Sequence, residues 1–397
     1  MEVKTGYKQT EVGVIPVEWE ITPFAELFAF RNGVNADKAS YGQGVRFINV
    51  LEPITYSHIH GPEITGQVTL PETVIASYSV RRGDVLFNRT SETQEEVALA
   101  ATYLGSERVV FGGFVIRGRP LDQRFDPVYS GYALRAPLIR LQIIPMGQGA
   151  IRANIGQQNL GLVVAPVPPV PEQRAIAEAL SDVDELLGGL DRLITKKRDL
   201  KQAAMQQLLT GQSRLPGFHG QWEETTFGSV VRHHAGNSTL IKGKLPSSEA
   251  TGRFPAYSAS GQDVWCDHFE HEGDAIVVSA VGSRCGKAFK ASGKWCAIAN
   301  THVVWPNAAK IDTRFLAYFI NDEDFWQKSG TGQPFVLFTK TFARPLHLPK
   351  LSEQTAIADL LTEIDLELAG LKQRREKTRG LKQAMMQELL TGRTRLV

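Results

Sequence analysis

Residues 200–211 read LKQAAMQQLLTG, and residues 381–392 read LKQAMMQELLTG, nearly the same stretch 181 residues later. The match extends without a gap over residues 172–215 and 353–396, where 24 of 44 aligned positions are identical. Each copy begins after a proline-containing segment and ends at a threonine-glycine pair. Proline before the first turn and glycine after the last turn are typical of helix ends. The sequence therefore predicts two long helices of the same design.

An apolar stripe runs along each of the two predicted helices. Its residues recur at steps of four and three, which is the spacing of a coiled-coil seam. They are Ile176, Leu180, Val183, Leu187 and Leu190 in the first copy, and Ile357, Leu361, Ile364, Leu368 and Leu371 in the second. Because the stripes match, we expect the helices to pack against each other as an antiparallel coiled coil. In the alternative interpretation, each helix packs separately on its own neighbouring domain.

The repeat divides the chain into a frame and two inserts. We expect a lead-in segment and first domain at 1–167, a central helix at 168–213, a second lead-in segment and domain at 214–348, and a C-terminal helix at 349–397. Tryptophan, glutamate, threonine and phenylalanine recur in both lead-in segments, at 19–24 and 222–227. The inserts themselves are far less alike.

Both inserts are rich in β-branched and aromatic runs interrupted by glycine, proline, asparagine and serine. The runs at 45–57, 84–91 and 274–283 predict short strands and loops, and one helix is expected in each insert, at 127–134 and 313–320. The predicted fold class is α/β (α+β). Two domains of irregular mixed sheet and helices are separated by the two long helices, and an internal pseudo-two-fold repeat relates the halves.

Composition sets few further limits. The 397 residues are 42% hydrophobic and 22% charged, with a formal net charge of +2, which suits a globular protein of two domains. The sequence has no membrane-length apolar run and no apolar stretch near its start, so a cytoplasmic location is expected. The three cysteines lie at irregular spacing in the second half and do not form a disulfide framework.

A search for catalytic motifs finds none. Phosphate-binding loop, H-E-x-x-H and G-x-S-x-G patterns are absent from the sequence. Cys266, His268, His271, Cys285 and Cys296 offer thiolate and imidazole groups, but not the paired spacing of structural zinc sites. We therefore expect ordinary buried thiols and loop histidines, with no metal ligands and no catalytic residues. A zinc-dependent hydrolytic enzyme built on this cluster remains the alternative.

Local charge gives the candidate binding residues. Twelve of the thirteen basic residues between 21 and 165 are arginine, whose planar fork suits phosphates and guanine edges. About half of them are expected to be ordinary surface residues. Charge and loop placement give as candidates for contact with such groups Arg46, Arg81, Arg82, Arg89 and Arg152 in the first insert, and Lys242, Arg284, Lys287 and Lys294 in the second.

The layout resembles a known family. The segments TGYKQTEVGVIPVEWE and LPGFHGQWEE, the P-x-x-x-EQ-x-AIA openings and the LKQ-x-x-MQ-x-LLTG ends resemble the specificity subunit of type I restriction–modification systems. The resemblance covers the whole chain in order. It implies a non-catalytic DNA-recognition subunit in which each insert is a target-recognition domain that reads one half of a bipartite, asymmetric site. The sequence also lacks the N-P-P-[FY] motif of adenine methyltransferases.

The resemblance also implies partners. Two methyltransferase subunits, which carry S-adenosylmethionine and methylate adenine N6, would dock on the helices. Restriction subunits with ATP and magnesium would supply the motor and nuclease. A helix over 172–209 would be about 57 Å long, and modules on one face of DNA favour half-sites roughly 34–36 Å apart. The alternative is a coiled-coil interaction scaffold without sequence-specific DNA binding.

Overall fold

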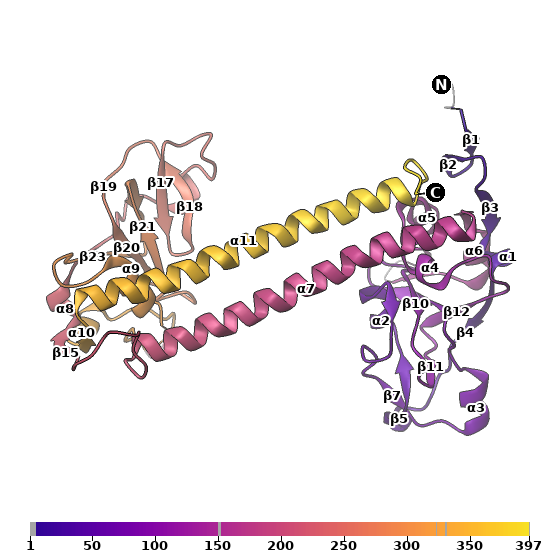
Figure 1. The fold of residues 1–397 in the computed structure, drawn as a ribbon, viewed down its shortest axis with the longest axis horizontal. Helices are drawn as coiled ribbons and strands as arrows, with labels where there is room; N and C mark the ends of the chain where they lie inside the picture. The colour runs from indigo at the N-terminus through magenta and orange to yellow at the C-terminus, as the bar shows by residue number, and fades with distance from the viewer. Residues whose placement is uncertain (1–4, 150–151, 323, 330–331, 397) are drawn as a thin grey trace. The chain divides into compact units, whose positions relative to one another are not determined.

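The computed structural model describes residues 5–149, 152–322, 324–329 and 332–396, and these form two compact units (Figure 1). The first unit comprises 1–190 with 374–397, and the second comprises 191–373. Two long helices, α7 (Val170–Leu209) and α11 (Leu351–Leu389), each contribute one end to each unit. The predicted pair of long helices is therefore confirmed. Within these described ranges, no helix is long and apolar enough to cross a membrane.

The first unit is built on a five-stranded sheet of order β4-β12-β8-β10-β6 and a three-stranded sheet of order β11-β5-β7. Smaller pairs are β1-β2, β13-β9 and β14-β3. The strands are β1 (Tyr7–Thr10), β2 (Gly13–Pro16), β3 (Glu20–Pro23), β4 (Phe28–Asn32), β5 (Tyr41–Ile48), β6 (His58–Ile59), β7 (Gln67–Val68), β8 (Val85–Asn88), β9 (Thr90–Ser91), β10 (Ala100–Tyr103), β11 (Val109–Phe111), β12 (Val115–Pro120), β13 (Ala153–Asn154) and β14 (Val164–Val167). The short helices are α1 (Phe24–Leu27), η1 (Lys38–Ser40), α2 (Leu51–Thr55), α3 (Glu72–Ser77), α4 (Pro127–Ala133), α5 (Pro137–Ile143), η2 (Ile144–Met146) and α6 (Gln157–Leu162).

The second unit has two four-stranded sheets, β16-β23-β20-β21 and β18-β17-β22-β19, and the pair β15-β24. Its strands are β15 (Glu223–Thr226), β16 (Val231–Ala235), β17 (Phe254–Ser258), β18 (Gly261–Cys266), β19 (His271–Glu272), β20 (Ala275–Ser279), β21 (Ala288–Ala291), β22 (Lys294–Ala297), β23 (Thr301–Pro306) and β24 (Pro345–Leu348). Its short helices are α8 (Phe227–Val230), η3 (Lys242–Lys244), α9 (Thr313–Phe319) and α10 (Phe338–Phe342).

The main sheets of the two units have the same strand order, which the sequence repeat shows only in part. Strands β4, β12, β8 and β10 follow one another in the first sheet as β16, β23, β20 and β21 do in the second. Each lead-in strand pairs antiparallel with the strand just before a long helix, β3 with β14 and β15 with β24. The predicted mixed α/β class with an internal repeat is confirmed.

One predicted strand run is wrong in part. The stretch 45–57 begins as strand β5, but residues 51–55 form helix α2. The Glu52 carboxylate accepts a hydrogen bond from the Asn49 backbone N–H at 2.9 Å, which links the first turn of the helix to the residue that follows β5. Pro53 also lies in the first turn, where its missing N–H costs little. A helical turn with this local hydrogen bond thus forms in a run whose β-branched composition predicted strand.

The glutamine of each EQ motif ties a long helix to its domain. In the first unit, Gln173 accepts from the Asp126 backbone N–H at 2.8 Å, and in the second Gln354 accepts from Asp312 at 3.0 Å. The same two aspartates cap helices α4 and α9. Helices at these places were predicted at 127–134 and 313–320, and both are confirmed.

Residues of each apolar stripe contact both the core of one domain and the end of the other long helix. Ile176 and Leu180 are fully buried in a cluster that also contains Leu389, the last residue of α11, and Leu390, which follows it. The corresponding cluster of the second unit holds Ile357 and Leu361 with Leu208 and Leu209 from the end of α7. Each helix start therefore packs on its domain and on the partner helix, so both interpretations of the stripe describe part of the packing. Val183, Leu187, Ile364 and Leu371 are half-buried, whereas Leu190 and Leu368 are buried.

A polar triad repeats beside these clusters. In the first unit, the Tyr132 hydroxyl donates to Asp184 at 2.9 Å, and Lys382 lies 2.6 Å from the same carboxylate. The second unit repeats this with Tyr318, Asp365 and Lys201, at 2.8 and 2.6 Å. Each triad joins a domain helix, the start of one long helix and the end of the other. The antiparallel pairing is thereby held in register inside each unit.

Candidate nucleic-acid interface

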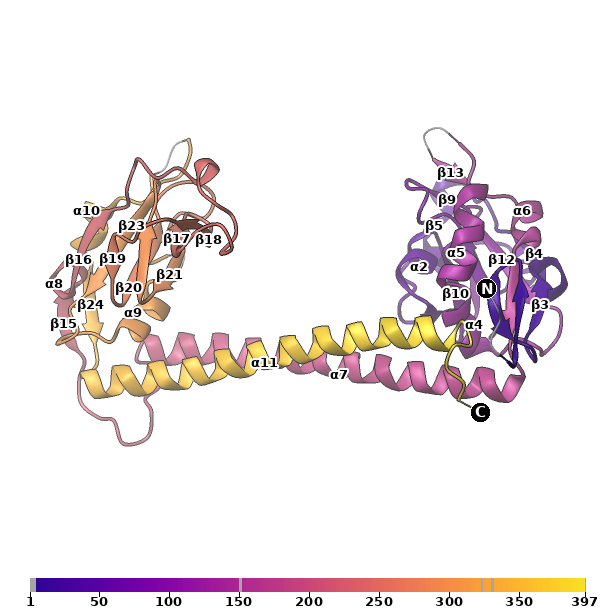
Figure 2. The same cartoon turned by 90° about the horizontal axis from the view of Figure 1, so that it is seen from above.

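The central strands β8 and β20 end in the same backbone arrangement. The N–H of Arg89, which follows β8, donates to the Phe114 carbonyl at 2.8 Å, and the N–H of Ala280 donates to Asn300 at 2.9 Å. The carbonyls of these two residues then accept from Ile155 at 3.0 Å and from Val336 at 2.9 Å. We call this junction the loop end of each domain. It is formed by Arg89, Phe114 and Ile155 in the first domain and by Ala280, Asn300 and Val336 in the second. Figure 2 shows β9 and β13 of the first loop end at the side of that unit remote from α7 and α11.

A hollow of about 280 Å³ lies at the first loop end. Its lining residues are Asn49, Val50, Thr90, Ser91, Glu92, Phe114 and Arg152. The Thr90 hydroxyl donates to Asn154 at 2.6 Å, which links β9 to β13. Phe114 is 55% exposed and Arg152 is exposed, so an aromatic ring and a guanidinium are presented to solvent together.

The structure brings Arg89 and Arg152 together at this loop end, but not Arg81 and Arg82. Those two precede β8 and lie at its opposite end, where the Arg81 backbone N–H donates to Asp84 and the Arg82 guanidinium donates to the Leu104 carbonyl. The arginines predicted in the first domain as ligand contacts therefore lie at opposite ends of β8.

Arg46 has an internal role in the structure. Its Nη1 donates to the carbonyls of Gly61 at 3.0 Å and Ile64 at 2.8 Å, and its Nε lies 2.6 Å from Glu107. These contacts fix the loop that follows β6. A contact to DNA would require Arg46 to give up at least part of this arrangement.

In the second domain, Lys242 and Arg284 meet around Ser260. Lys242 pairs with Asp263 and lies 3.4 Å from the Ser260 hydroxyl, while Arg284 donates to the Ser260 carbonyl at 3.3 Å. Both side chains are exposed, and Lys287 follows Arg284 at the second loop end. Lys294 begins β22 at the other end of β20, where its amine lies 4.5 Å from the centre of the Phe269 ring.

The arginine enrichment of the first domain is partly structural. Arg135 donates to the carbonyls of Pro53, Tyr56 and Ala100 through Nη1 and to that of Ile54 through Nη2, and burial lowers its pKa. Arg117, Arg119 and Arg140 also donate to backbone carbonyls inside the domain. Several arginines therefore satisfy loop carbonyls and are not available for a ligand.

Phe114 lines the hollow at the first loop end and was not among the candidates predicted from charge. It follows Gly112 and Gly113, where a Cβ atom would lie 2.5 Å from the Phe47 ring and 2.0 Å from Asn35 Oδ1, respectively. A side chain at position 112 would displace the buried Phe47 ring, and one at position 113 would require the exposed Asn35 side chain to move. The turn formed by these two glycines is followed by Phe114. A double glycine before an aromatic residue was the available sequence signal.

Each central strand also ends in a buried polar side chain without a hydrogen-bond partner among the described residues. These are both amide atoms of Asn88 and the hydroxyl of Ser279, and each residue is fully buried. Their carbonyls accept from Ala98 and Gly286, which both have positive φ. The loop ends thus correspond in backbone detail while their side chains differ.

The cysteine cluster has the environment of core thiols. Cys266, Cys285 and Cys296 are all buried and free, and Cys296 donates to the His268 carbonyl at 3.2 Å. Burial raises the pKa of Cys296 to about 12, which keeps the thiol protonated. In the described part of the chain, no three His, Cys, Asp or Glu side chains are grouped as metal ligands.

Comparison with known proteins agrees with this architecture. Residues 220–378 match the family model of the type I restriction modification DNA specificity domain. A Methanocaldococcus jannaschii protein assigned as the specificity subunit of the type I restriction enzyme MjaX is 25% identical, over 98% of this chain and 97% of its own length. The resemblance to type I specificity subunits is confirmed.

Solved specificity subunits share the fold over nearly the whole chain. The S subunit of the type I system from M. genitalium aligns with a TM-score of 0.61 at 17% identity, covering 98% of both chains. A chain from a structure on complex assembly and conformational transition of the type I R-M system aligns with a TM-score of 0.58 at 16% identity, covering 95% of this chain and 99% of its own. At such identities the comparison supports the specificity-subunit fold and leaves individual residue roles to the geometry above.

Proposed function

We propose that the chain is the DNA-recognition subunit of a type I restriction–modification enzyme, and that each loop end reads one half of a bipartite, asymmetric target. The observation that carries the proposal is the pair of loop ends, which share their backbone hydrogen bonds but differ in their side chains. A common backbone frame lets both domains approach DNA in the same way. Different side chains then select different bases.

The chemistry of the two loop ends suits unlike half-sites. In the first, Arg89 and Arg152 offer guanidinium forks for phosphates or guanine edges, and Phe114 offers an apolar face for a thymine methyl group. In the second, Arg284 and Lys287 offer positive charge, and Asn300 offers an amide that can read an adenine edge. Contacts to phosphates would position each domain, and contacts to base edges would give the specificity.

The chemical steps are assigned to partners. In this proposal the chain supplies no catalytic group, and the paired helices dock two methyltransferase subunits that bind S-adenosylmethionine and methylate adenine N6. Restriction subunits supply ATP- and magnesium-dependent motor and nuclease activity in the cytoplasm. The names of the related specificity subunits and the full-length likeness to their fold support this division of work.

The second loop end gives the most direct test of DNA contact. An Arg284→Ala, Lys287→Ala double variant should bind duplex target more weakly, and the slope of log affinity against log salt should fall by about two, because roughly one unit is lost for each phosphate contact. Lys294→Ala, at the other end of β20, is the matched control and should change the slope less. Full affinity with an unchanged slope in the double variant would contradict the proposed interface. Binding without any sequence preference would favour the scaffold alternative.

A further inference from the structure

Each loop end is completed by a segment that keeps the spacing of the helical repeat. Residues 147–155 and 328–336 lie 181 positions apart, without a gap before the repeated helices, but only one of the nine aligned positions is identical. We call their last residues, 152–155 and 333–336, the outer segments of the two domains. The spacing is thus preserved in a stretch whose side chains have diverged.

The two outer segments are held in the same backbone register. The Gln148 N–H donates to the Asn154 carbonyl at 2.9 Å. The Ser329 N–H donates to the Phe335 carbonyl at 2.9 Å as well. On their other side, Asn154 and Phe335 pair antiparallel with the second residue after β8 and after β20, respectively. Aligned residues of the two outer segments therefore occupy equivalent positions in their domains.

Side chains of the outer segments alternate between the core and the surface, as expected for extended chains. Ala153 and Ile155 are buried in the core of the first domain, and Val336 is buried in the core of the second. Arg152 and Gln333, which are aligned with each other, are both exposed. The same position therefore presents a guanidinium in one domain and an amide in the other.

These two side chains are available for a ligand. No hydrogen bond joins the Arg152 guanidinium or the Gln333 amide to another of the described residues. The nearby Asn154 amide is engaged internally, because it accepts from the Thr90 hydroxyl at 2.6 Å and donates to the Arg152 carbonyl at 3.0 Å. Its counterpart, Phe335, has no polar side-chain group. Positions 152 and 333 thus carry the polar side chains that each outer segment can offer to DNA.

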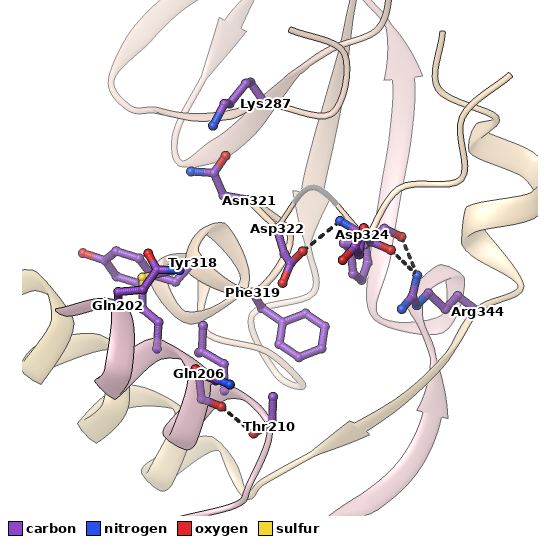
Figure 3. Close-up of a pocket in the computed structure, with 13 residues that line it drawn as sticks. Gln202, Gln206, Thr210, Lys287, Tyr318, Phe319, Asn321, Asp322, Asp324 and Arg344 are labelled. Carbon is purple, nitrogen blue, oxygen red and sulfur yellow. Dashed lines mark hydrogen bonds between the residues drawn. The ribbon is translucent and has the colours of Figure 1, made fainter. Parts of the chain in front are cut away.

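Contacts from the rest of each domain fix the chain that leads into its outer segment. In the first domain, the Gln94 amide donates to the Gly147 carbonyl at 3.1 Å. In the second, Arg344 donates to the carbonyls of Asp324 and Phe325 at 2.8 Å, beside the hollow drawn in Figure 3. Support of this kind favours precise placement of a side chain that reads a base.

Arginine and glutamine discriminate between the two purines. An arginine guanidinium can donate two hydrogen bonds to O6 and N7 of guanine, whereas a glutamine amide can donate to N7 of adenine and accept from its N6 amine. The guanidinium has no acceptor, so it cannot pair with that amine. An exchange of arginine for glutamine at one backbone position would therefore change the base that is read without changing how the domain approaches DNA.

We propose that Arg152 and Gln333 are equivalent base-reading residues, and that Arg152 selects guanine in one half-site while Gln333 selects adenine at the corresponding position of the other. The inference rests on the proposed function, because it assumes that each domain reads one half-site. It adds that a single aligned position of the repeat determines one base in each half-site.

Two reciprocal substitutions test the assignment, and each variant is the control for the other. The full-length chain, assembled with its methyltransferase subunit, selects duplexes from a randomised pool, and the selected DNA is sequenced. For Gln333→Arg, we expect guanine to replace one adenine of one half-site, with a shift in preference of roughly tenfold or more at that base pair. For Arg152→Gln, we expect adenine to replace one guanine of the other half-site.

A motif that is unchanged in both variants, or that changes in the half-site of the unsubstituted domain, would overturn the inference. Gln333→Ala is the milder variant, and it should keep DNA binding while accepting any base at the same position. Loss of all DNA binding by this variant would also overturn the inference. A wild-type complex that selects no bipartite motif would instead contradict the proposed function, and the inference with it.

A modified base tests the contact at a single atom. 7-Deazaadenine has a C–H group in place of N7, so it removes one acceptor from the edge that Gln333 would contact. At the selected adenine, this base should weaken binding by the wild-type complex about fivefold, as expected for one lost hydrogen bond, and should leave binding by Gln333→Ala unchanged. Equal losses for the two complexes, or no loss for either, would overturn the inference.

Discussion

At the residue scale, the two loop ends differ most plainly where Phe114 of the first domain corresponds to Asn300 of the second. The two residues accept the same backbone hydrogen bond but present an exposed aromatic ring in one domain and an amide in the other. This position is therefore where we expect the half-sites to differ. Its substitution should change DNA binding more than folding.

We expect Phe114→Ala to weaken binding to the DNA target by about 1–2 kcal/mol, within the range for loss of one good base contact. The free energy of unfolding should change little, because the ring is 55% exposed. Leu121→Ala is the matched control, since Leu121 is 56% exposed and lies just beyond the opposite end of β12. Titration of labelled duplex at fixed salt compares the two variants. Equal losses of affinity would show that Phe114 is not a specific contact.

A second residue-scale prediction concerns acid stability. The His302 ring stacks on Phe338 with 3.6 Å between ring centres, and burial, with His233 and His234 nearby, lowers the pKa of His302 to about 4. The folded state thus binds this proton less readily than the unfolded state. The stabilisation is fully present above about pH 6.5 and is lost as pH falls toward 4, by about 1.4 kcal/mol per pH unit for one proton.

His302→Asn removes the group that titrates. Urea unfolding between pH 7 and 5 should show a shallower loss of stability for this variant than for the wild type. Identical pH slopes for the two proteins would refute the assignment to His302.

At the element scale, the two long helices could be predicted from the sequence, because a 44-residue repeat with an apolar stripe is a local pattern. The candidate DNA-contact residues could be predicted only in part, because charge does not show where a side chain points. Arg135 and Arg46 donate hydrogen bonds to backbone carbonyls of other segments of the chain. Helix α2 was missed because its residues have a strand-like composition, and the hydrogen bond from the Asn49 N–H to Glu52 in its first turn is not visible in that composition.

The starts of the long helices carry buried carboxylates that differ in their partners. Glu172 is fully buried and accepts from Arg395 and from the Trp19 indole, at 2.8 and 2.9 Å. Glu353 is 1% exposed and pairs with Arg214, while the Trp222 indole N–H has no hydrogen-bond partner among the described residues. The second carboxylate thus depends on one side-chain donor where the first has two.

We therefore expect Arg214→Ala to destabilise the protein more than Arg395→Ala. Removing either arginine leaves a buried carboxylate without its cation, and the remaining Trp19 donor should offset part of that loss in the Arg395 variant. Chemical denaturation of the two variants in parallel measures the difference. A larger loss for Arg395→Ala would contradict this account of the helix starts.

At the scale of the whole molecule, the helices are proposed to set the gap between the two DNA half-sites. Four residues added before Leu200 and four before Leu381 would lengthen each helix by about 6 Å while leaving the triads of each unit intact. The recognised gap should lengthen, and the two half-sites should stay the same. Altered half-sites with an unchanged gap would show that the helices are not a spacer.

The central claim is that this chain chooses a bipartite DNA sequence for partner subunits that modify it. Mapping of N6-methyladenine in DNA from cells that express the chain with its methyltransferase subunit tests the claim directly. We expect methylation confined to one motif, in which two unlike half-sites flank a gap of unspecified bases. A palindromic or continuous motif, or no motif despite a demonstrably assembled complex, would contradict the claim.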